Sequence, residues 1–243
     1  MPLLTTLLLF LLLLPLCCRI RACRLGGRFT RARQLYRLGA WLLGGMVLAA
    51  MAAQETILLL AGQLTWATAL PLHLCSLMGL CTLPALLTRR ETLLHALLLL
   101  GAPGAALALL FPAIMDTPWP RVTRLFFIIM HAGIFLAPLL PLSLGWRPRC
   151  RGACQAGVFL LTAGAVALPV NRLTGGNYLF LSGPVAGTPL ILLHQWGWGS
   201  YLLLLAALAA LLLTTEAVLM RLCVCTKRRR TGEMNENPRN TGR

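Results

Sequence analysis

The sequence predicts an all-α fold, a polytopic membrane bundle of about seven transmembrane helices, and three observations lead to this prediction. Of the 243 residues, 58% are hydrophobic and 12% are charged, whereas soluble domains contain about 45–50% and about 25%. Asp, Glu, Lys and Arg are absent from long apolar runs, the longest of which covers residues 173–215. An uncharged run of about 18 residues is long enough to cross a bilayer as a helix. Runs of this length exclude a soluble globular domain. Because they show no alternation with period two, they also exclude a β-barrel.

Seven predicted spans follow one another along the chain, and basic residues separate them. Seven arginines lie between the first and second spans, Arg89 and Arg90 follow the third, and Arg121 and Arg124 follow the fourth. Three more arginines follow the fifth span, Arg172 follows the sixth, and a basic segment follows the last. The predicted spans lie near residues 2–18, 36–57, 69–88, 93–112, 124–143, 153–171 and 201–221.

The formal net charge of +16 indicates the orientation of the chain in the membrane rather than a nucleic-acid partner. If the seven spans cross in turn, nineteen of the 22 Lys and Arg residues lie on one side. Basic residues in short loops stay in the cytoplasm, so the N-terminus is predicted outside or in the lumen and the C-terminus inside. Residues 1–225 then form a single integral membrane domain, and residues 226–243 form a polar, basic cytoplasmic tail. A cleaved signal peptide is the alternative interpretation of the first segment.

Nine cysteines are present, and the predicted topology indicates that most of them are free thiols. Seven lie at the cytoplasmic side, where disulfides are rare. Their spacing lacks the paired Cys or His ligands of a zinc site, so no metal site is predicted. The other two, Cys75 and Cys81, lie inside the third span.

Several polar side chains lie inside or near the ends of the predicted spans, where they are costly and are the first candidates for a functional site. The third span contains His73 and Cys75, and the fifth contains His131. With a rise of about 1.5 Å per residue, these three lie about 10 Å below the outer ends of their helices. The second and sixth spans add further polar residues at or just beyond their outer ends, which are Glu55, Asn171, Asn177 and Tyr178. A site in the outer half of the bilayer is therefore predicted.

Helix geometry limits which of these side chains can act together. Residues two apart project to nearly opposite faces, so His73 cannot be the base for Cys75 if this segment is helical. His131 comes from another helix at a compatible depth, and Glu55 would hold its imidazole in the right tautomer. This reasoning selects Cys75 as a nucleophile and His131 as its base. Two further histidines have no predicted partner and no predicted role, and they are His95 and His194.

Four short elements of the sequence carry a family resemblance. They are Leu70-Pro71-Leu72-His73-Leu74-Cys75-Ser76, Phe126-Phe127 with His131, Val170-Asn171-Arg172-Leu173 leading to Asn177-Tyr178, and Leu110-Phe111-Pro112. In order and spacing they resemble the YwaF / transmembrane protein 164 family of multi-pass integral membrane proteins. The vertebrate branch of that family is associated with acyl transfer to ether-linked lysophospholipids, and the family is distantly similar to membrane-embedded lipid hydrolases. The resemblance implies that the essential Cys and His of the family are Cys75 and His131.

The first functional hypothesis is therefore a phospholipid acyltransferase, with a lipid hydrolase as a close variant. Cys75 would take the acyl group as a thioester, and His131 would move the proton. The other polar residues would support the oxyanion, orient the base or bind substrate, and they are His73, Glu55, Asn171, Asn177 and Tyr178. The alternatives are a transporter or channel, favoured by Gly and Pro interruptions of the helices, and a membrane scaffold without chemistry.

The predicted partners are membrane phospholipids, as environment and as candidate substrate. The sequence contains no nucleotide-binding loop, metal-ligand pattern or nucleic-acid motif, so no cofactor, metal or nucleic acid is predicted. The predicted location is the plasma membrane in a bacterium, or an endomembrane or the plasma membrane in a eukaryote.

Overall fold

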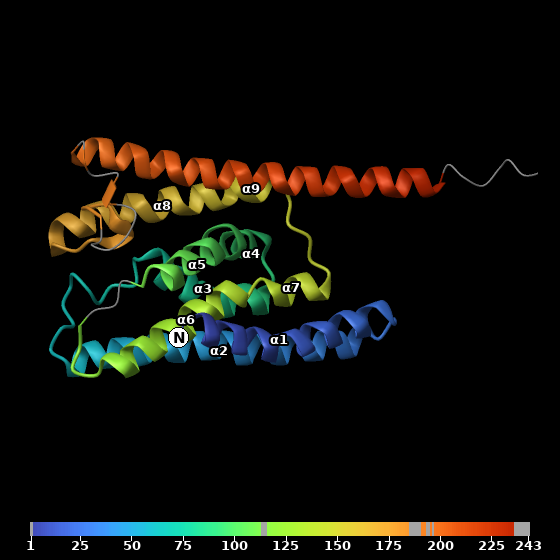
Figure 1. The fold of residues 1–243 in the computed structure, drawn as a ribbon, viewed down its shortest axis with the longest axis horizontal. Helices are drawn as coiled ribbons and strands as arrows, with labels where there is room; N and C mark the ends of the chain where they lie inside the picture. Colours follow the sequence, from blue (N-terminus) through green and yellow to red (C-terminus); the bar gives the residue numbers. More distant parts are fainter. Residues whose placement is uncertain (1, 113–115, 185–190, 193–194, 196, 236–243) are drawn as a thin grey trace, which may run out of the picture.

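The computed structural model describes residues 2–235 except 113–115, 185–190, 193–194 and 196, and every regular element in this part of the chain is helical (Figure 1). The all-α prediction is therefore confirmed. In chain order the elements are α1 (Pro2–Leu25), α2 (Phe29–Leu60), α3 (Leu74–Thr88), α4 (Glu91–Ala96), the π-helical turn η1 (Leu97–Gly101), α5 (Ala102–Leu110), α6 (Pro120–Leu136), α7 (Leu139–Leu144), α8 (Arg151–Thr174), the 3-10 turn η2 (Tyr178–Phe180) and α9 (Trp198–Asn235).

Six helical segments among the described residues are long and apolar enough to cross a membrane. They are Pro2–Leu25, Phe29–Leu60, Glu91–Leu110, Pro120–Leu144, Arg151–Thr174 and Trp198–Val218. The seventh apolar helix is α3, whose 15 residues reach only about 22 Å, less than the hydrocarbon thickness of about 30 Å. The prediction of about seven membrane helices is confirmed, with one helix too short to cross the bilayer alone.

The peripheral helices carry large apolar side chains on their outer surfaces. Leu12 on α1 is 75% exposed, Leu161 on α8 is 76% exposed and Leu203 on α9 is 74% exposed. Extended apolar surfaces of this kind are unfavourable in water and favourable in contact with lipid chains. The surface of the bundle thus agrees with the membrane location indicated by its composition.

Several predicted spans have other boundaries in the structure: α1 continues to Leu25 and α9 to Asn235, both beyond the predicted ends, and proline accounts for two of the remaining differences. The predicted span 69–88 is helical only from Leu74, because Pro71 disfavours helical backbone angles at the residue before it and has no N–H to donate. The predicted span 124–143 consists of two helices, α6 and α7, which are separated next to Pro138. The second span begins earlier than predicted, at Phe29, so part of the arginine-rich loop is helical.

The helices run back and forth, so their connections gather at two ends of the bundle (Figure 1). One end carries the segment 61–73 and the loop 175–184, and the opposite end carries the connections 26–28 and 145–150. Gly175 ends α8 with a φ of 70°, a left-handed conformation that glycine adopts without a Cβ clash. Following the predicted topology, we call the first the outer end and the second the inner end.

The centre of the bundle is formed by α2, α3 and α6, whose backbones approach closely at glycines. A Cβ on Gly44 of α2 would lie 2.8 Å from Leu83 on α3, and a Cβ on Gly133 of α6 would collide with Val47 on α2. Small residues permit such close packing between membrane helices. The pair α8 and α9 lies on one side of this centre and α1 lies on the other (Figure 1).

The fourth membrane segment departs from regular α-helical geometry. The chain passes from α4 through the π-helical turn η1 into α5, and Pro103 follows this turn. Since proline donates no backbone hydrogen bond, the wider turn accommodates the interrupted ladder. A Cβ on Gly101, the last residue of η1, would lie 3.3 Å from Met78 on α3 and 3.3 Å from Ile134 on α6. The irregular turn thus contacts the two helices that carry the predicted catalytic pair.

Candidate functional site

The segment 61–73 enters the outer end of the bundle without forming a continuous helix, so its backbone groups need partners from elsewhere. Tyr178 supplies two of these partners. Its hydroxyl donates to the carbonyl of Trp66 at 2.8 Å and accepts from the N–H of Leu70 at 3.1 Å. The side chain of Tyr178 is fully buried. One tyrosine from the loop after α8 therefore fixes the backbone that leads into α3.

Two asparagines hold the loop that presents Tyr178. The Nδ2 of Asn171, in the last turn of α8, donates to the Tyr178 carbonyl at 3.0 Å, and its Oδ1 accepts from the Tyr178 N–H at 2.7 Å. Asn177 contacts the residues that follow, since it accepts from the N–H of Ser182 at 3.0 Å and donates to the carbonyl of Gly183 at 2.8 Å. Both side chains therefore support loop backbone.

His73 lies immediately before α3 rather than inside a helix, so the prediction that it shares a helix with Cys75 is wrong. Its backbone is extended, with φ −69° and ψ 147°. Its ring packs against two aromatic rings of the loop, with centroid distances of 5.1 Å to Tyr178 and 5.6 Å to Phe180. His73 thereby joins the start of α3 to the same loop that Asn171 holds.

Cys75 lies in the first turn of α3, next to backbone donors that precede the helical hydrogen bonds. The first of these bonds runs from the N–H of Leu77 to the carbonyl of His73 at 2.9 Å. No side chain caps this end of α3. The backbone N–H groups that lie ahead of the ladder are those of Leu74, Cys75 and Ser76. The Cys75 side chain itself is partly buried against the core.

His131 lies in α6 and is only 3% exposed. Its Nδ1 is 2.8 Å from the carbonyl of Phe127; because a carbonyl only accepts, Nδ1 carries the proton and Nε2 holds the basic lone pair. The role predicted for Glu55, orienting His131, is therefore taken by a backbone carbonyl, and the Glu55 side chain is exposed. The polar side chain of α2 that contacts α6 is Gln54, whose amide nitrogen lies 3.5 Å from the sulfur of Met130.

Cys75 and His131 occupy corresponding levels of two helices that contact each other. Met78 follows Cys75 by one turn and Ile134 follows His131 by one turn, and both flank Gly101. Residues three apart lie on the same side of a helix. Cys75 and His131 therefore lie about one turn nearer the outer end than this contact, on two helices that both meet η1. The hydrogen bonds of the described residues do not join the two side chains directly.

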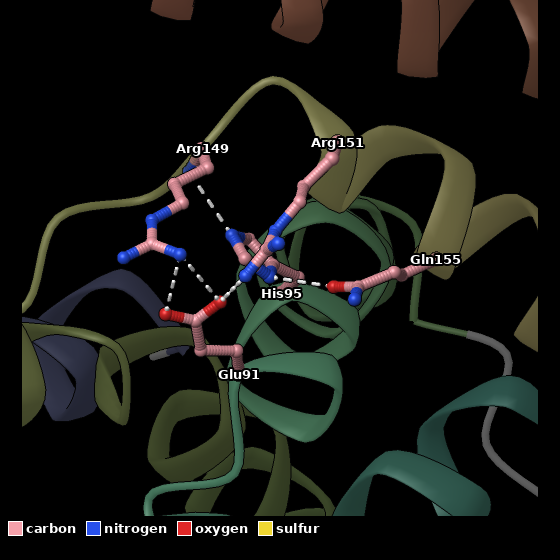
Figure 2. A network of polar contacts seen from close by, with 5 residues as sticks. All are labelled: Glu91, His95, Arg149, Arg151 and Gln155. Carbon is pink, nitrogen blue, oxygen red and sulfur yellow. Dashed lines mark hydrogen bonds and ion pairs between the residues drawn. The ribbon is translucent and has the colours of Figure 1, made fainter.

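A second polar cluster lies at the inner end, where α4 meets the connection before α8 and its first turns (Figure 2). The Nε2 of His95 accepts from the backbone N–H of Arg149 at 3.0 Å, so its proton is on Nδ1, which lies 3.0 Å from Oε1 of Gln155. The carboxylate of Glu91 forms ion pairs with Arg149 and Arg151. The prediction that His95 has no partner is therefore wrong, because its partners come from a distant part of the sequence.

The described residues contain no group of three or more His, Cys, Asp or Glu side chains that could hold a metal ion. The cysteines whose side chains the structure describes are free thiols. His194, for which no role is predicted, lies outside the described residues.

A comparison with known protein families agrees with the resemblance seen in the sequence. The TMEM164 family model matches residues 1–215 of the 243-residue chain. The match includes both polar clusters and nearly all of the membrane segments. No curated protein and no solved structure matches the chain. The matched region and the apolar helices within it lead to one conclusion: this multi-pass integral membrane protein belongs to the TMEM164 family.

Proposed function

We propose that this protein is a membrane-embedded acyltransferase that moves an acyl chain between phospholipids, with Cys75 as nucleophile and His131 as general base. The observation that carries the proposal is that Cys75 on α3 and His131 on α6 lie at matching levels, each one turn from the contact that both helices make at Gly101. Membership in the TMEM164 family and a surface of exposed apolar side chains support a lipid as the substrate.

The first turn of α3 supports the nucleophile with backbone donors. A helix N-terminus attracts negative charge because its first N–H groups have no partner within the helix. Cys75 lies among these groups, so they can stabilise both its thiolate and the oxyanion of a tetrahedral intermediate. Asn171 and Asn177 then act as positioning residues, since their amides hold the loop against which His73 packs.

The proposed reaction has two halves. First, Nε2 of His131 takes the thiol proton, and the Cys75 sulfur attacks the ester carbonyl of a donor phospholipid. The ester C–O bond breaks, a thioester forms on Cys75, and the lysophospholipid leaves with the proton from His131. In the second half, the hydroxyl of an acceptor lysophospholipid gives its proton to His131 and attacks the thioester; the C–S bond breaks, and the thiol regains the proton. Water in place of the acceptor gives hydrolysis.

An apolar groove beside the start of α3 suits an acyl chain. It has a volume of about 220 Å³ and lies between α8 and two residues that precede and follow Cys75 in the sequence, Leu72 and Leu77. Its lining contains no charged side chain and consists of Leu72, Leu77, Phe159, Thr162, Ala163 and Val166. Because the neighbouring surface of α8 is exposed and apolar, a lipid chain can reach this groove from within the bilayer.

The test is transfer of a labelled acyl chain from phosphatidylcholine to a lysophospholipid by the purified full-length protein in vesicles. Cys75→Ala should abolish the transfer, and His131→Gln should reduce its rate by about 10²–10⁴-fold, as expected for loss of a general base. Cys81→Ala is the matched control, because Cys81 is a second, partly buried thiol on α3. It should retain full activity.

The acyl intermediate gives an independent readout. Incubation with donor lipid alone should add one acyl group to Cys75, which mass spectrometry detects and hydroxylamine removes. The assignment of the nucleophile is excluded if Cys75→Ala transfers acyl chains normally, or if the acyl group is found on Cys81.

The proposed orientation keeps the N-terminus outside or in the lumen and Cys75 in the outer half of the bilayer. A protease site inserted between Gly26 and Gly27 tests it, because this turn is exposed at the inner end. In intact cells that carry the protein in the plasma membrane, added protease should cleave only after the membrane is permeabilised, whereas in intact isolated organelles, whose cytoplasmic face is outward, it should cleave directly. Cleavage of intact cells, or protection in intact organelles, would reverse the orientation.

A further inference from the structure

A cavity lies at the inner end of the bundle, far from Cys75 along the membrane normal. Its volume is about 380 Å³, within the range of about 300–1,000 Å³ that small-ligand pockets have. It forms where the ends of α3 and α7 meet α4. Its lining combines one guanidinium and one hydroxyl with mainly apolar side chains and consists of Thr88, Arg89, Leu94, Pro141, Leu144 and Trp146.

Two buried hydrogen-bond donors next to this cavity have no acceptor among the described residues. They are Nε of Arg24 and Nε1 of Trp146. Arg24, in the last turn of α1, packs against Gly145, which lies between the lining residues Leu144 and Trp146. The Nη1 of Arg24 would lie 3.1 Å from a Cβ placed on Gly145. Buried donors without acceptors are costly, so both groups favour a ligand that supplies acceptor atoms.

Protein carboxylates do not neutralise the arginines at this cavity. In the part of the chain that the structure describes, the ion pairs all go to Glu91, which is bound by Arg149 and Arg151. Arg24 and Arg89 have no ion pair within the same residues. Positive charge therefore remains at the cavity, and it favours an anionic ligand.

Arg89 occupies a backbone position that is unfavourable for its side chain. It ends α3 in the left-handed conformation, with φ 54° and ψ 29°. Glycine is the residue usually found at such a position, because an L side chain crowds the backbone there. Strained positions of this kind are concentrated at ligand sites. The side chain of Arg89 lines the cavity and is also exposed, so a ligand at the membrane surface can reach it.

We propose that this cavity binds a phosphate group, supplied by an anionic phospholipid of the adjacent leaflet. The guanidinium groups of Arg24 and Arg89 bind the phosphate oxygens, as arginine does in many phosphate sites. The apolar wall then contacts the glycerol and the start of the acyl chains. Basic pockets between transmembrane helices on the cytoplasmic side commonly hold anionic headgroups. Free phosphate has the same acceptor atoms, so the experiment includes both sources.

The experiment measures the unfolding temperature of the purified full-length protein in a neutral detergent during titration with one of two probes, dihexanoyl phosphatidic acid or inorganic phosphate. A ligand that binds only the folded protein raises this temperature. We expect phosphatidic acid to act at lower concentration than inorganic phosphate, which assigns the site to lipid. Equal potency would assign it to free phosphate and overturn the lipid assignment.

The informative variant is Arg89→Gly, because it removes the guanidinium and relieves the left-handed strain. The unliganded variant should therefore be at least as stable as the wild type, while its apparent affinity falls by at least about fivefold, the effect of one arginine near a membrane surface. Arg24→Gln should weaken binding similarly. Arg90→Gln is the charge-matched control, since Arg90 is exposed, has an extended backbone and does not line the cavity.

The proposal is overturned by any of three results. The first is that neither probe stabilises the wild-type protein. The second is that Arg89→Gly binds phosphatidic acid as well as the wild type does, and the third is that Arg90→Gln loses as much affinity as Arg89→Gly. The last result would mean that the probes respond to net charge rather than to the cavity.

Discussion

The two polar clusters of this protein join helices by different means. At the outer end, Asn171, Tyr178 and His73 use an amide, a hydroxyl and packed rings, and none of their contacts is an ion pair. At the inner end, Glu91 binds two arginines whose side chains are 58% and 60% exposed. The outer cluster is largely buried and contains no ion pair, whereas the charges of the inner cluster keep much of their contact with solvent.

This difference follows from the cost of transferring polar groups out of water. A neutral group with its hydrogen bonds satisfied can be buried at moderate cost, whereas a buried ion loses hydration that a single partner replaces only in part. The outer cluster can therefore hold non-helical backbone next to lipid, as membrane segments require. We expect its removal to be more damaging than removal of the exposed ion pairs, and four predictions test this order.

The largest effect should come from Asn171→Ala. The change removes two hydrogen bonds, leaves the buried N–H of Tyr178 without its partner, and leaves the Tyr178 carbonyl with only the N–H of Leu181, at 3.3 Å. The expected loss is about 3 kcal/mol of unfolding free energy, since an abandoned buried group costs about 1–3 kcal/mol and the second lost bond adds about 1 kcal/mol. Chemical unfolding in a mild detergent measures it.

The matched control is Asn177→Ala in the same loop. Its amide also makes two hydrogen bonds to backbone, but its side chain is only half-buried, so water can replace some of them. We expect about half the loss seen for Asn171→Ala. If the two variants lose the same free energy, burial is not what makes the outer cluster important.

The second prediction concerns the buried part of the inner cluster. A Cβ on Gly152 would collide with the imidazole of His95, which two hydrogen bonds hold in place. Gly152→Ala should therefore cost about 2 kcal/mol through overpacking. Gly164→Ala, on the same helix, meets no atom within 4 Å and should be neutral or slightly stabilising. Equal stability of the two variants would mean that the contact between α4 and α8 gives way easily.

The third prediction separates the two ends by their effect on the proposed nucleophile. Tyr178→Phe keeps the ring next to His73 but removes the hydroxyl that binds the segment before α3, at a cost of about 1 kcal/mol. The reaction of Cys75 with a membrane-permeant maleimide should become faster as this segment loosens. Tyr36→Phe removes a hydroxyl bonded to Leu86 near the inner end and should leave the rate unchanged. A change of rate in both variants would contradict a local effect.

Most of the helices could be predicted because an uncharged apolar run has few other structures available in a membrane. The breaks were harder, although proline is present at each of them. Pro71 precedes the start of α3 and Pro138 separates two helices, yet other prolines lie inside continuous helices, namely Pro15, Pro84 and Pro169. Which proline ends a helix depends on whether neighbouring segments supply partners for the interrupted backbone, and composition does not contain that information.

The candidate site was predictable in depth but not in direction. Depth comes from counting residues along a helix, and His73, Asn171 and Tyr178 do lie together at the outer end. Direction changes by about 100° per residue, so α2 turns Gln54 toward α6 and leaves its neighbour Glu55 exposed. The partners of the inner histidine could not be identified either, because they follow a connection whose path the sequence alone does not determine.

The smallest effect should come from Glu91→Gln, which removes both ion pairs of the inner cluster. The arginines keep their hydration, and exposed ion pairs contribute little to stability. We expect a slight fall in unfolding temperature at low salt that disappears at high salt, because ions screen exposed charges beyond about 10 Å at 0.1 M. The loss for Gly152→Ala should not depend on salt, since it arises from packing. Unfolding temperatures of both variants at two salt concentrations test this distinction. A salt-independent loss for Glu91→Gln as large as that for Asn171→Ala would show that the inner cluster relies on its carboxylate as much as the outer cluster relies on its amide, and the contrast between the two ends would not hold.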